Sequence, residues 1–202
     1  MTRTTKTTTV MVLAMAAFSG ALLRAVAPAG QDGPVRPENV TPEKKKARIE
    51  RGAQLVSTMG CNDCHTPWKL GPKGPEPDMS RALTGHPSDV IMPPAPPAHG
   101  PWIGHSSATN TAFAGPWGVS FTANLTPDKD TGLGAWTEDM FIATVRTGRH
   151  QGKGRPILPP MPYWMIGNLP DEEIKSIFAY LQSLAPVKNK VPAPIEPAEG
   201  GR

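Results

Sequence analysis

The chain has 202 residues, of which 25 are proline and 20 are glycine, and 38% are hydrophobic. This length suits one domain with tails, and the many turn-forming residues predict long irregular connections rather than a large packed core. The formal charge of +4 belongs mostly to residues 1–27, which hold three bases and no acid, so the remainder is close to +1. Nothing in this balance indicates nucleic-acid binding.

The N-terminus has the order of a secretory signal. Two bases precede an apolar run over residues 10–23, and small residues follow at positions 25–27. We interpret residues 1–27 as a signal peptide, whose cleavage site Pro28 leaves uncertain, and keep an uncleaved membrane anchor as the alternative. The run is short for a lone membrane-spanning helix. We therefore expect a periplasmic protein that meets a membrane only if this segment is retained.

Residues 28–40 are rich in Pro, Gly and charge, and are interpreted as a flexible lead-in. Thr41-Pro42 then begins a predicted helix over residues 42–58. The Thr side chain can accept from a free amide of the first turn, and Pro is tolerated at the first helical position. Gly60 is expected to end the helix directly before the cysteines.

Cys61-Asn62-Asp63-Cys64-His65 is a Cys-x-x-Cys-His motif, and these are the only two cysteines in the chain. Two cysteines three positions apart can form thioethers with two vinyl groups on one edge of a haem, and the next residue places an imidazole under the iron. The motif predicts one haem c, covalently bound through Cys61 and Cys64. A dithiol redox pair and a zinc site are weaker alternatives, since no βαβ pattern or matching second ligand pair is evident.

Residues 66–120 show no sustained periodicity and are predicted to be a long irregular insertion. A second helix is expected over about 137–147, capped by Thr137 and closed by Gly148. A third follows Pro170, because apolar residues recur there at offsets of three and four. Its stripe consists of Ile174, Ile177, Phe178, Leu181 and Leu184. The Pro-rich tail, residues 188–202, is expected to be disordered.

Met161 is the predicted sixth ligand of the iron. It lies in Pro159-Pro160-Met161-Pro162-Tyr163, just before the last helix, and the flanking prolines stiffen the loop that would hold a weak thioether ligand. Met92 is a competitor within the insertion, and a Met in such a loop can also simply fill a gap in the core. Four further histidines are other candidates, namely His86, His99, His105 and His150.

Two aromatic residues are candidate haem neighbours. Trp136 could donate its indole N–H to a propionate, although it could equally be a core aromatic at a helix start. Tyr163 could pack beside the ring of the haem in a similar way.

Together these features resemble the class I cytochrome c family over residues 42–187. The chain is most similar to the cytochrome c subunits of periplasmic or membrane-bound dehydrogenases, in which a segment like residues 124–136 precedes the second helix and the Met-Pro-Tyr loop. The resemblance implies an all-α fold, with helices around one covalent haem. It also implies that Cys61 and Cys64 form the thioethers and that His65 and Met161 are the axial ligands.

The family resemblance favours a mono-haem electron-transfer protein with a cytochrome domain over residues 41–187. Its expected partners are a dehydrogenase as electron donor and a cytochrome or oxidase of a respiratory chain as acceptor. The chain departs from the dehydrogenase subunits in one respect, since those usually join two or three haem modules and this chain has one motif. The alternative function is a haem enzyme or ligand sensor with an open or labile sixth iron site.

Overall fold

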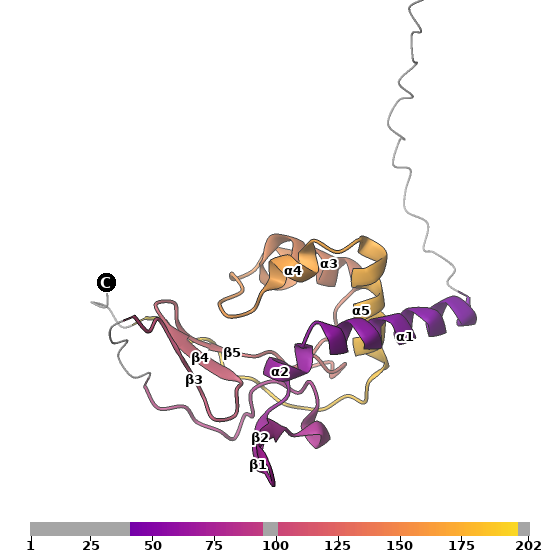
Figure 1. The fold of residues 1–202 in the computed structure, drawn as a ribbon. Coiled ribbons are helices and arrows are strands. Elements are labelled where there is room, and N and C mark those ends of the chain that lie inside the picture. Colours follow the sequence, from indigo (N-terminus) through magenta and orange to yellow (C-terminus); the bar gives the residue numbers. More distant parts are fainter. Residues whose placement is uncertain (1–40, 95–100, 198–202) are drawn as a thin grey trace, which may run out of the picture. The chain divides into compact units, whose positions relative to one another are not determined.

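The computed structural model describes residues 41–94 and 101–197 (Figure 1). The predicted signal peptide, the lead-in and residues 198–202 lie outside the described residues. The helices are α1 (Pro42–Thr58), α2 (Cys61–His65), α3 (Glu138–Thr147), α4 (Tyr163–Gly167) and α5 (Asp171–Ser183), with 3-10 turns at η1 (Met79–Arg81) and η2 (His150–Gly152). The strands are β1 (Trp68–Gly71), β2 (Gly74–Pro77), β3 (His105–Ser106), β4 (Ala112–Gly115) and β5 (Gly118–Phe121).

The three long helices begin where their local sequence predicts, and α1 and α3 also end there, whereas α5 ends at Ser183, one residue before the predicted Leu184. Thr41 and Thr137 each occupy an N-cap position, and each side chain accepts a hydrogen bond from an amide three residues further on. Gly148 ends α3 in the left-handed region, at a φ of 65°. The predicted stripe of α5 is buried from Ile174 to Leu181. Within the described parts of the chain, no helix is long and apolar enough to span a bilayer.

The prediction of an all-α fold is wrong. Among the described residues, 37% are helical and 14% lie in strands that form two antiparallel sheets. One sheet is the β1–β2 hairpin, and the other has the strand order β3-β4-β5. All of these strands fall between residues 66 and 121, so the segment predicted to be irregular contains the sheets.

The glycines and prolines of this segment form hairpin turns. Gly71-Pro72-Lys73-Gly74 joins β1 to β2, and Gly115-Pro116-Trp117-Gly118 joins β4 to β5, with the two glycines paired in each case. Proline suits the second position of a tight turn, and the closing glycine adopts a positive φ, 119° at Gly74 and 89° at Gly118. Strands of two to four residues are too short to reveal a period of two, which is why the pattern was missed.

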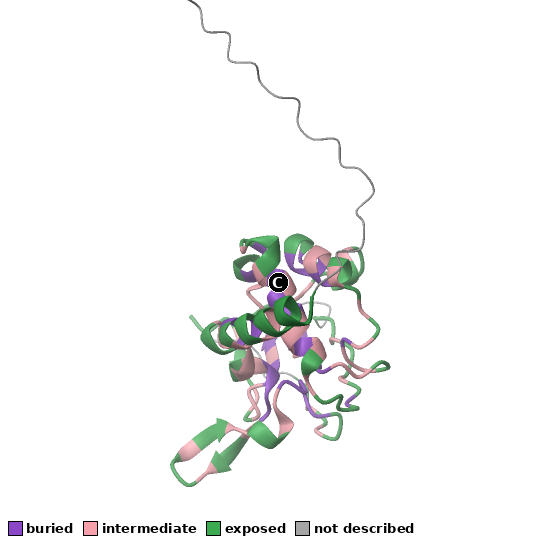
Figure 2. Cartoon of the chain, turned by 90° about the vertical axis from the view of Figure 1, so that its right-hand side faces the viewer, coloured by how far each residue is buried: buried purple, intermediate pink, exposed green. Residues whose placement is uncertain are grey.

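The core lies where α1 crosses α5, and the buried residues gather in the interior of the domain (Figure 2). Gly52 is buried at the crossing, where an added Cβ would collide with the Ser176 carbonyl and the Tyr180 side chain. Two ion pairs, Arg48–Glu172 and Arg51–Glu173, both with N–O distances of 2.7 Å, join the same helices at the surface. The largely exposed β1–β2 hairpin projects from the lower end of the domain in the view of Figure 2.

Residues 188–197 of the C-terminal tail are ordered, contrary to the expectation of disorder. The Val119 amide donates to the Ile195 carbonyl (2.8 Å) and the Ile195 amide donates back (2.9 Å), so the tail adds a bridge to β5. Asn189 is 6% exposed. Hydrogen bonds and one buried polar side chain therefore hold the tail in place, and a search for apolar periodicity does not detect them.

We expect Gly52→Ala to destabilise the domain, because the new methyl group has no space between α1 and the backbone of α5. Overpacking of this kind costs about 1–3 kcal/mol. Chemical unfolding of the variant should show a lower midpoint. Ser57→Ala, at an exposed position of the same helix, is the control and should change the midpoint little. Equal midpoints for both variants would contradict the close approach of the helices.

Candidate haem-attachment site

The cysteine pair lies on a short helix of its own. Gly60 adopts a left-handed conformation with a φ of 68°, which separates α1 from α2, so Cys61 is the first residue of α2. Positions 61 and 64 are three apart, and residues at this spacing share one face of a helix. Both side chains are partly buried free thiols. The arrangement places two sulfur atoms on one face, beside the imidazole that ends the helix.

His65 is held by the carbonyl of Ala123, which lies 2.8 Å from its Nδ1. A carbonyl only accepts hydrogen bonds, so Nδ1 carries the proton and Nε2 keeps its lone pair. Burial lowers the pKa of His65, which favours this neutral form, while the hydrogen bond to Ala123 opposes the shift. A fixed neutral imidazole with a free Nε2 is the form in which histidine binds iron.

The insertion anchors α2 through side chains that sequence reasoning did not identify. The Asp63 carbonyl accepts from Trp68 Nε1 (2.9 Å) and from Asn110 Nδ2 (2.8 Å). Thr66 is fully buried, where its hydroxyl donates to Asn62 Oδ1 and accepts from the Leu83 amide. Because these contacts join residues up to 47 positions apart, no local spacing indicates them.

Three of the predicted site residues pack against one hydrophobic cluster. Cys61, Trp136 and Met161 are partly buried beside a core formed by α1, α3, α4, α5 and nearby loops. The Trp136 ring also meets His150 edge-on, with centroids 5.1 Å apart. The structure thus brings a thiol, an aromatic ring and a thioether from distant parts of the chain to the same core.

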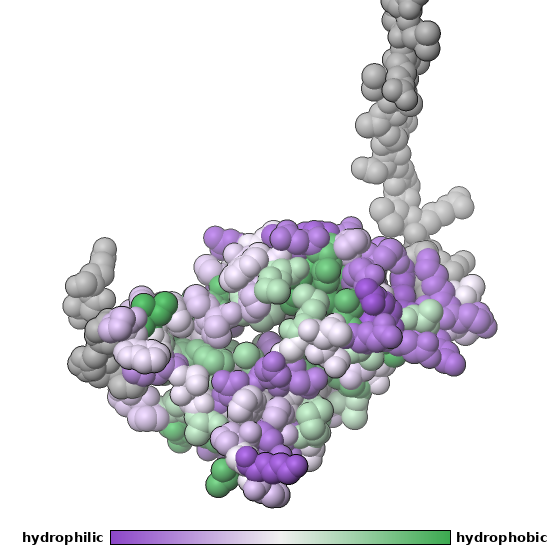
Figure 3. All heavy atoms as spheres, viewed as in Figure 1, coloured by the Kyte–Doolittle hydropathy of each residue, from purple (hydrophilic) through white to green (hydrophobic). Residues whose placement is uncertain are grey.

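The loop before Met161 is fastened to the sheet. Ser120 on β5 donates its hydroxyl to the Pro159 carbonyl at 2.6 Å, a contact that the sequence did not indicate. Pro160 also lines a small pocket beside β3 and β4. The space-filling view shows the surface hollowed between the α3–α4 helices and the sheet, with hydrophobic residues along the hollow (Figure 3).

Tyr163 lies at the start of α4 and is partly buried. Its ring packs against Gly148, the residue that ends α3, and meets Trp164 edge-on at a centroid distance of 5.5 Å. Tyr163 therefore links α4 to α3. Contacts of Tyr163 and Trp136 with a haem remain predictions.

The alternative uses of these residues find little support. Burial raises the pKa of Cys61 to about 11, and burial followed by the charge of Asp63 raises the pKa of Cys64, whereas a reactive dithiol needs a stabilised thiolate. His86 is fully buried, with Nδ1 2.9 Å from Thr111 Oγ1 and Nε2 3.0 Å from the Val90 carbonyl, so neither nitrogen is free for a metal. In residues 41–94 and 101–197, no three His, Cys, Asp or Glu side chains gather as a metal site.

The donor set fits a covalently attached haem. Two thiols on one helix face, a buried neutral imidazole and a stiff Met loop beside the same hydrophobic cluster match what a haem c requires from a protein. The apolar side chains would shield the ring, and the polar contacts of α2 hold the two cysteines and His65 in place.

Comparison with known proteins places this domain among cytochrome subunits. The chain is 37% identical over 90 residues to the gluconate 2-dehydrogenase cytochrome c subunit of Pantoea cypripedii, covering 41% of this chain and 20% of that protein. It is 30% identical over 150 residues to the alcohol dehydrogenase (quinone) cytochrome c subunit of Gluconobacter oxydans, covering 73% and 24%. It is also 28% identical over 147 residues to a nicotinate dehydrogenase subunit of Pseudomonas putida, covering 73% and 9%. No model of a protein family matches the sequence.

The chain is a relative of the cytochrome c subunits of dehydrogenases, which confirms the resemblance seen in its motifs. It matches less than a quarter of the length of each of these three proteins. The relationship therefore concerns a cytochrome domain, and the activities named for the larger proteins are not assigned to this chain by it.

We expect Trp68→Phe to weaken the hold on α2, because phenylalanine cannot donate to the Asp63 carbonyl. Loss of one such hydrogen bond costs about 1 kcal/mol, in addition to the loss of ring volume. Trp117→Phe is the matched control, since Trp117 Nε1 is buried and has no hydrogen-bond partner among the described residues. Thermal unfolding should show the larger loss for Trp68→Phe, and an equal or smaller loss would contradict the anchoring role.

Proposed function

We propose that this chain is a mono-haem c-type cytochrome that transfers single electrons and catalyses no substrate chemistry itself. Cys61 and Cys64 would hold the haem covalently, and His65 and Met161 would be its axial ligands. The observation that carries the proposal is the imidazole of His65, whose protonated Nδ1 is held at Ala123, directly after the two thiols of α2. The relationship to cytochrome c subunits supports electron transfer as the function.

The residues of the chain would keep the iron site rigid during electron transfer. A haem with one His and one Met ligand supplies a one-electron couple that changes its geometry little. The Ala123 carbonyl fixes the imidazole, the Ser120 hydroxyl fixes the loop of Met161, and the cluster around Trp136 excludes water. This rigidity favours fast electron exchange, since few protein groups have to move.

We further propose that the chain works in the periplasm, between a dehydrogenase as donor and a cytochrome or oxidase as acceptor. The basic and apolar order of residues 1–27 and the extracytoplasmic attachment of haem c support this compartment. The dehydrogenase names of the relatives support a donor of this kind. Whether residues 1–27 remain as an anchor decides whether the membrane is also a partner.

The sixth ligand provides the test, because Met161 and Met92 are rival candidates. In a host that matures c-type cytochromes, the ferric wild type should be low-spin and show a thioether-to-iron charge-transfer band. Met161→Ala should abolish this band, produce a high-spin spectrum and bind carbon monoxide rapidly in the ferrous form. The control, Met92→Ala, should retain the wild-type spectra.

Two results would count against this assignment. Loss of the band in Met92→Ala alone would make Met92 the ligand. A high-spin wild type that binds carbon monoxide rapidly would favour the alternative function, a haem enzyme or sensor with an open sixth site.

A further inference from the structure

We infer that Asn189, in the C-terminal tail, is a positioning residue for the His65 imidazole. The inference rests on the proposed function, because His65 is the proposed axial ligand of the iron. It assigns a role to a segment that follows the last helix and that the sequence suggested was disordered.

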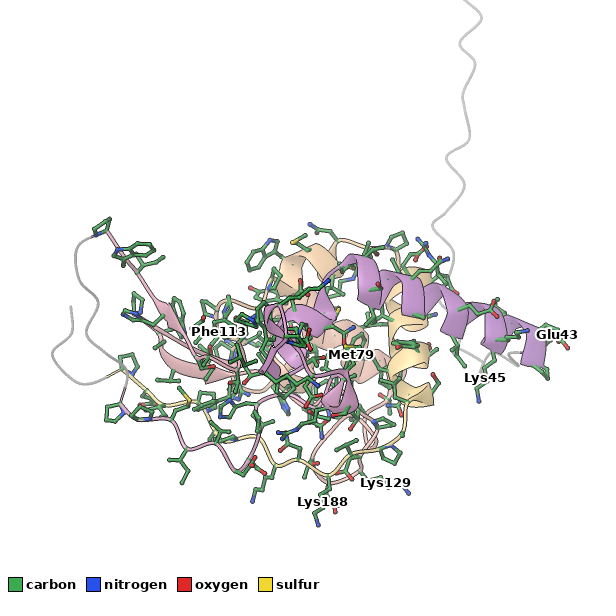
Figure 4. The ribbon with its side chains drawn as sticks, turned by 60° about the horizontal axis from the view of Figure 1, so that its bottom comes forward. Glu43, Lys45, Met79, Phe113, Lys129 and Lys188 are labelled. Atoms are coloured by element: carbon green, nitrogen blue, oxygen red, sulfur yellow. The ribbon has the colours of Figure 1, made fainter. Side chains whose placement is uncertain are left out.

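The tail is held in place on both sides of Asn189. The Val187 carbonyl accepts from Asn124 Nδ2 at 2.8 Å, and the Asn189 amide donates to Thr131 Oγ1 at 3.0 Å. Lys188, between them, is exposed and points away from the domain beside Lys129 (Figure 4). The backbone therefore directs Lys188 to solvent and Asn189 inward.

The Asn189 side chain directs both of its hydrogen-bond donors and its acceptor to one loop, residues 84–88. Nδ2 donates to the carbonyls of Thr84 (2.7 Å) and His86 (2.9 Å), and Oδ1 accepts from the Ser88 amide (3.0 Å). Only an amide of this length offers two donors and an acceptor to these three backbone groups. A smaller side chain would leave buried polar groups unpaired, which is costly.

The same loop holds His65 directly. The Gly85 amide donates to the His65 carbonyl at 2.8 Å, and the His86 amide donates to the Thr122 carbonyl at 3.0 Å. Gly85 has a φ of 77°, and a Cβ there would lie within 2.6 Å of Thr122 and Ala123 backbone atoms. The loop is thus packed against the peptide whose carbonyl accepts from His65 Nδ1.

These contacts form a continuous path from Asn189 to the imidazole. Asn189 fixes the outer side of the 84–88 loop, and the inner side of that loop fixes both the His65 backbone and the position of the Ala123 carbonyl. A hydrogen bond at Nδ1 makes the imidazole a stronger donor to iron and so favours the ferric state. If the loop relaxes, this hydrogen bond weakens and the midpoint potential rises.

The test compares wild type, Asn189→Ala and Thr41→Ala as mature haem-containing proteins. Asn189→Ala should raise the midpoint potential in a spectroelectrochemical titration and should speed hydrogen exchange at the Gly85 amide. Thr41→Ala removes the cap of α1, remote in sequence from the loop, and should lower stability without changing the midpoint potential. An unchanged potential in Asn189→Ala, or an equal shift in Thr41→Ala, would overturn the inference.

A second measurement covers the case in which Asn189→Ala fails to fold. In the wild type, the Ser88 and Gly85 amides should be protected from exchange to a similar degree, because Asn189 joins both to one unit. Free exchange at Ser88 would show that the tail does not hold the loop. A wild type without haem would refute the proposed function instead, so the two failures are distinguishable.

Discussion

The hydrogen bond between His65 Nδ1 and the Ala123 carbonyl is the constraint on which the rest of the site depends. It fixes which nitrogen carries the proton and the direction in which Nε2 points. The cysteines on α2 would set the edge of the haem that is attached, but they would not orient the imidazole. The contacts of Trp68 and Asn110 hold α2, and the loop at Gly85 packs against the Ala123 peptide, so the imidazole and this carbonyl are held together.

This constraint gives the long insertion a structural role. Residues 66–120 supply Trp68 and Asn110 to the Asp63 carbonyl, and the loop with Gly85 to the His65 carbonyl. A chain rich in Pro and Gly buries little apolar surface, so polar contacts of backbone atoms do much of the positioning. The tail completes the arrangement from the opposite side of the loop through Asn189.

Local chemistry made the helices predictable, and the prediction of haem attachment at Cys61 and Cys64 rests on equally local spacing. Thr41, Thr137 and Gly148 act within one helical turn of their own positions, and the stripe of α5 repeats at helical spacing. The sheets were missed because their strands are short, although the repeated Gly-Pro-x-Gly turns were visible. The partners of His65 and Asn189 lie 58 and about 100 residues away, and no pattern in one sequence identifies such contacts.

The most direct test concerns the bond between the chain and its pigment. Trypsin should release residues 52–69, between Arg51 and Lys69, with both cysteines in one peptide. After extraction of the mature protein with acidified acetone, mass spectrometry should find this peptide heavier by one haem and without free thiols. If the extracted protein is colourless and the same peptide carries two cysteines that can be alkylated, the account is contradicted.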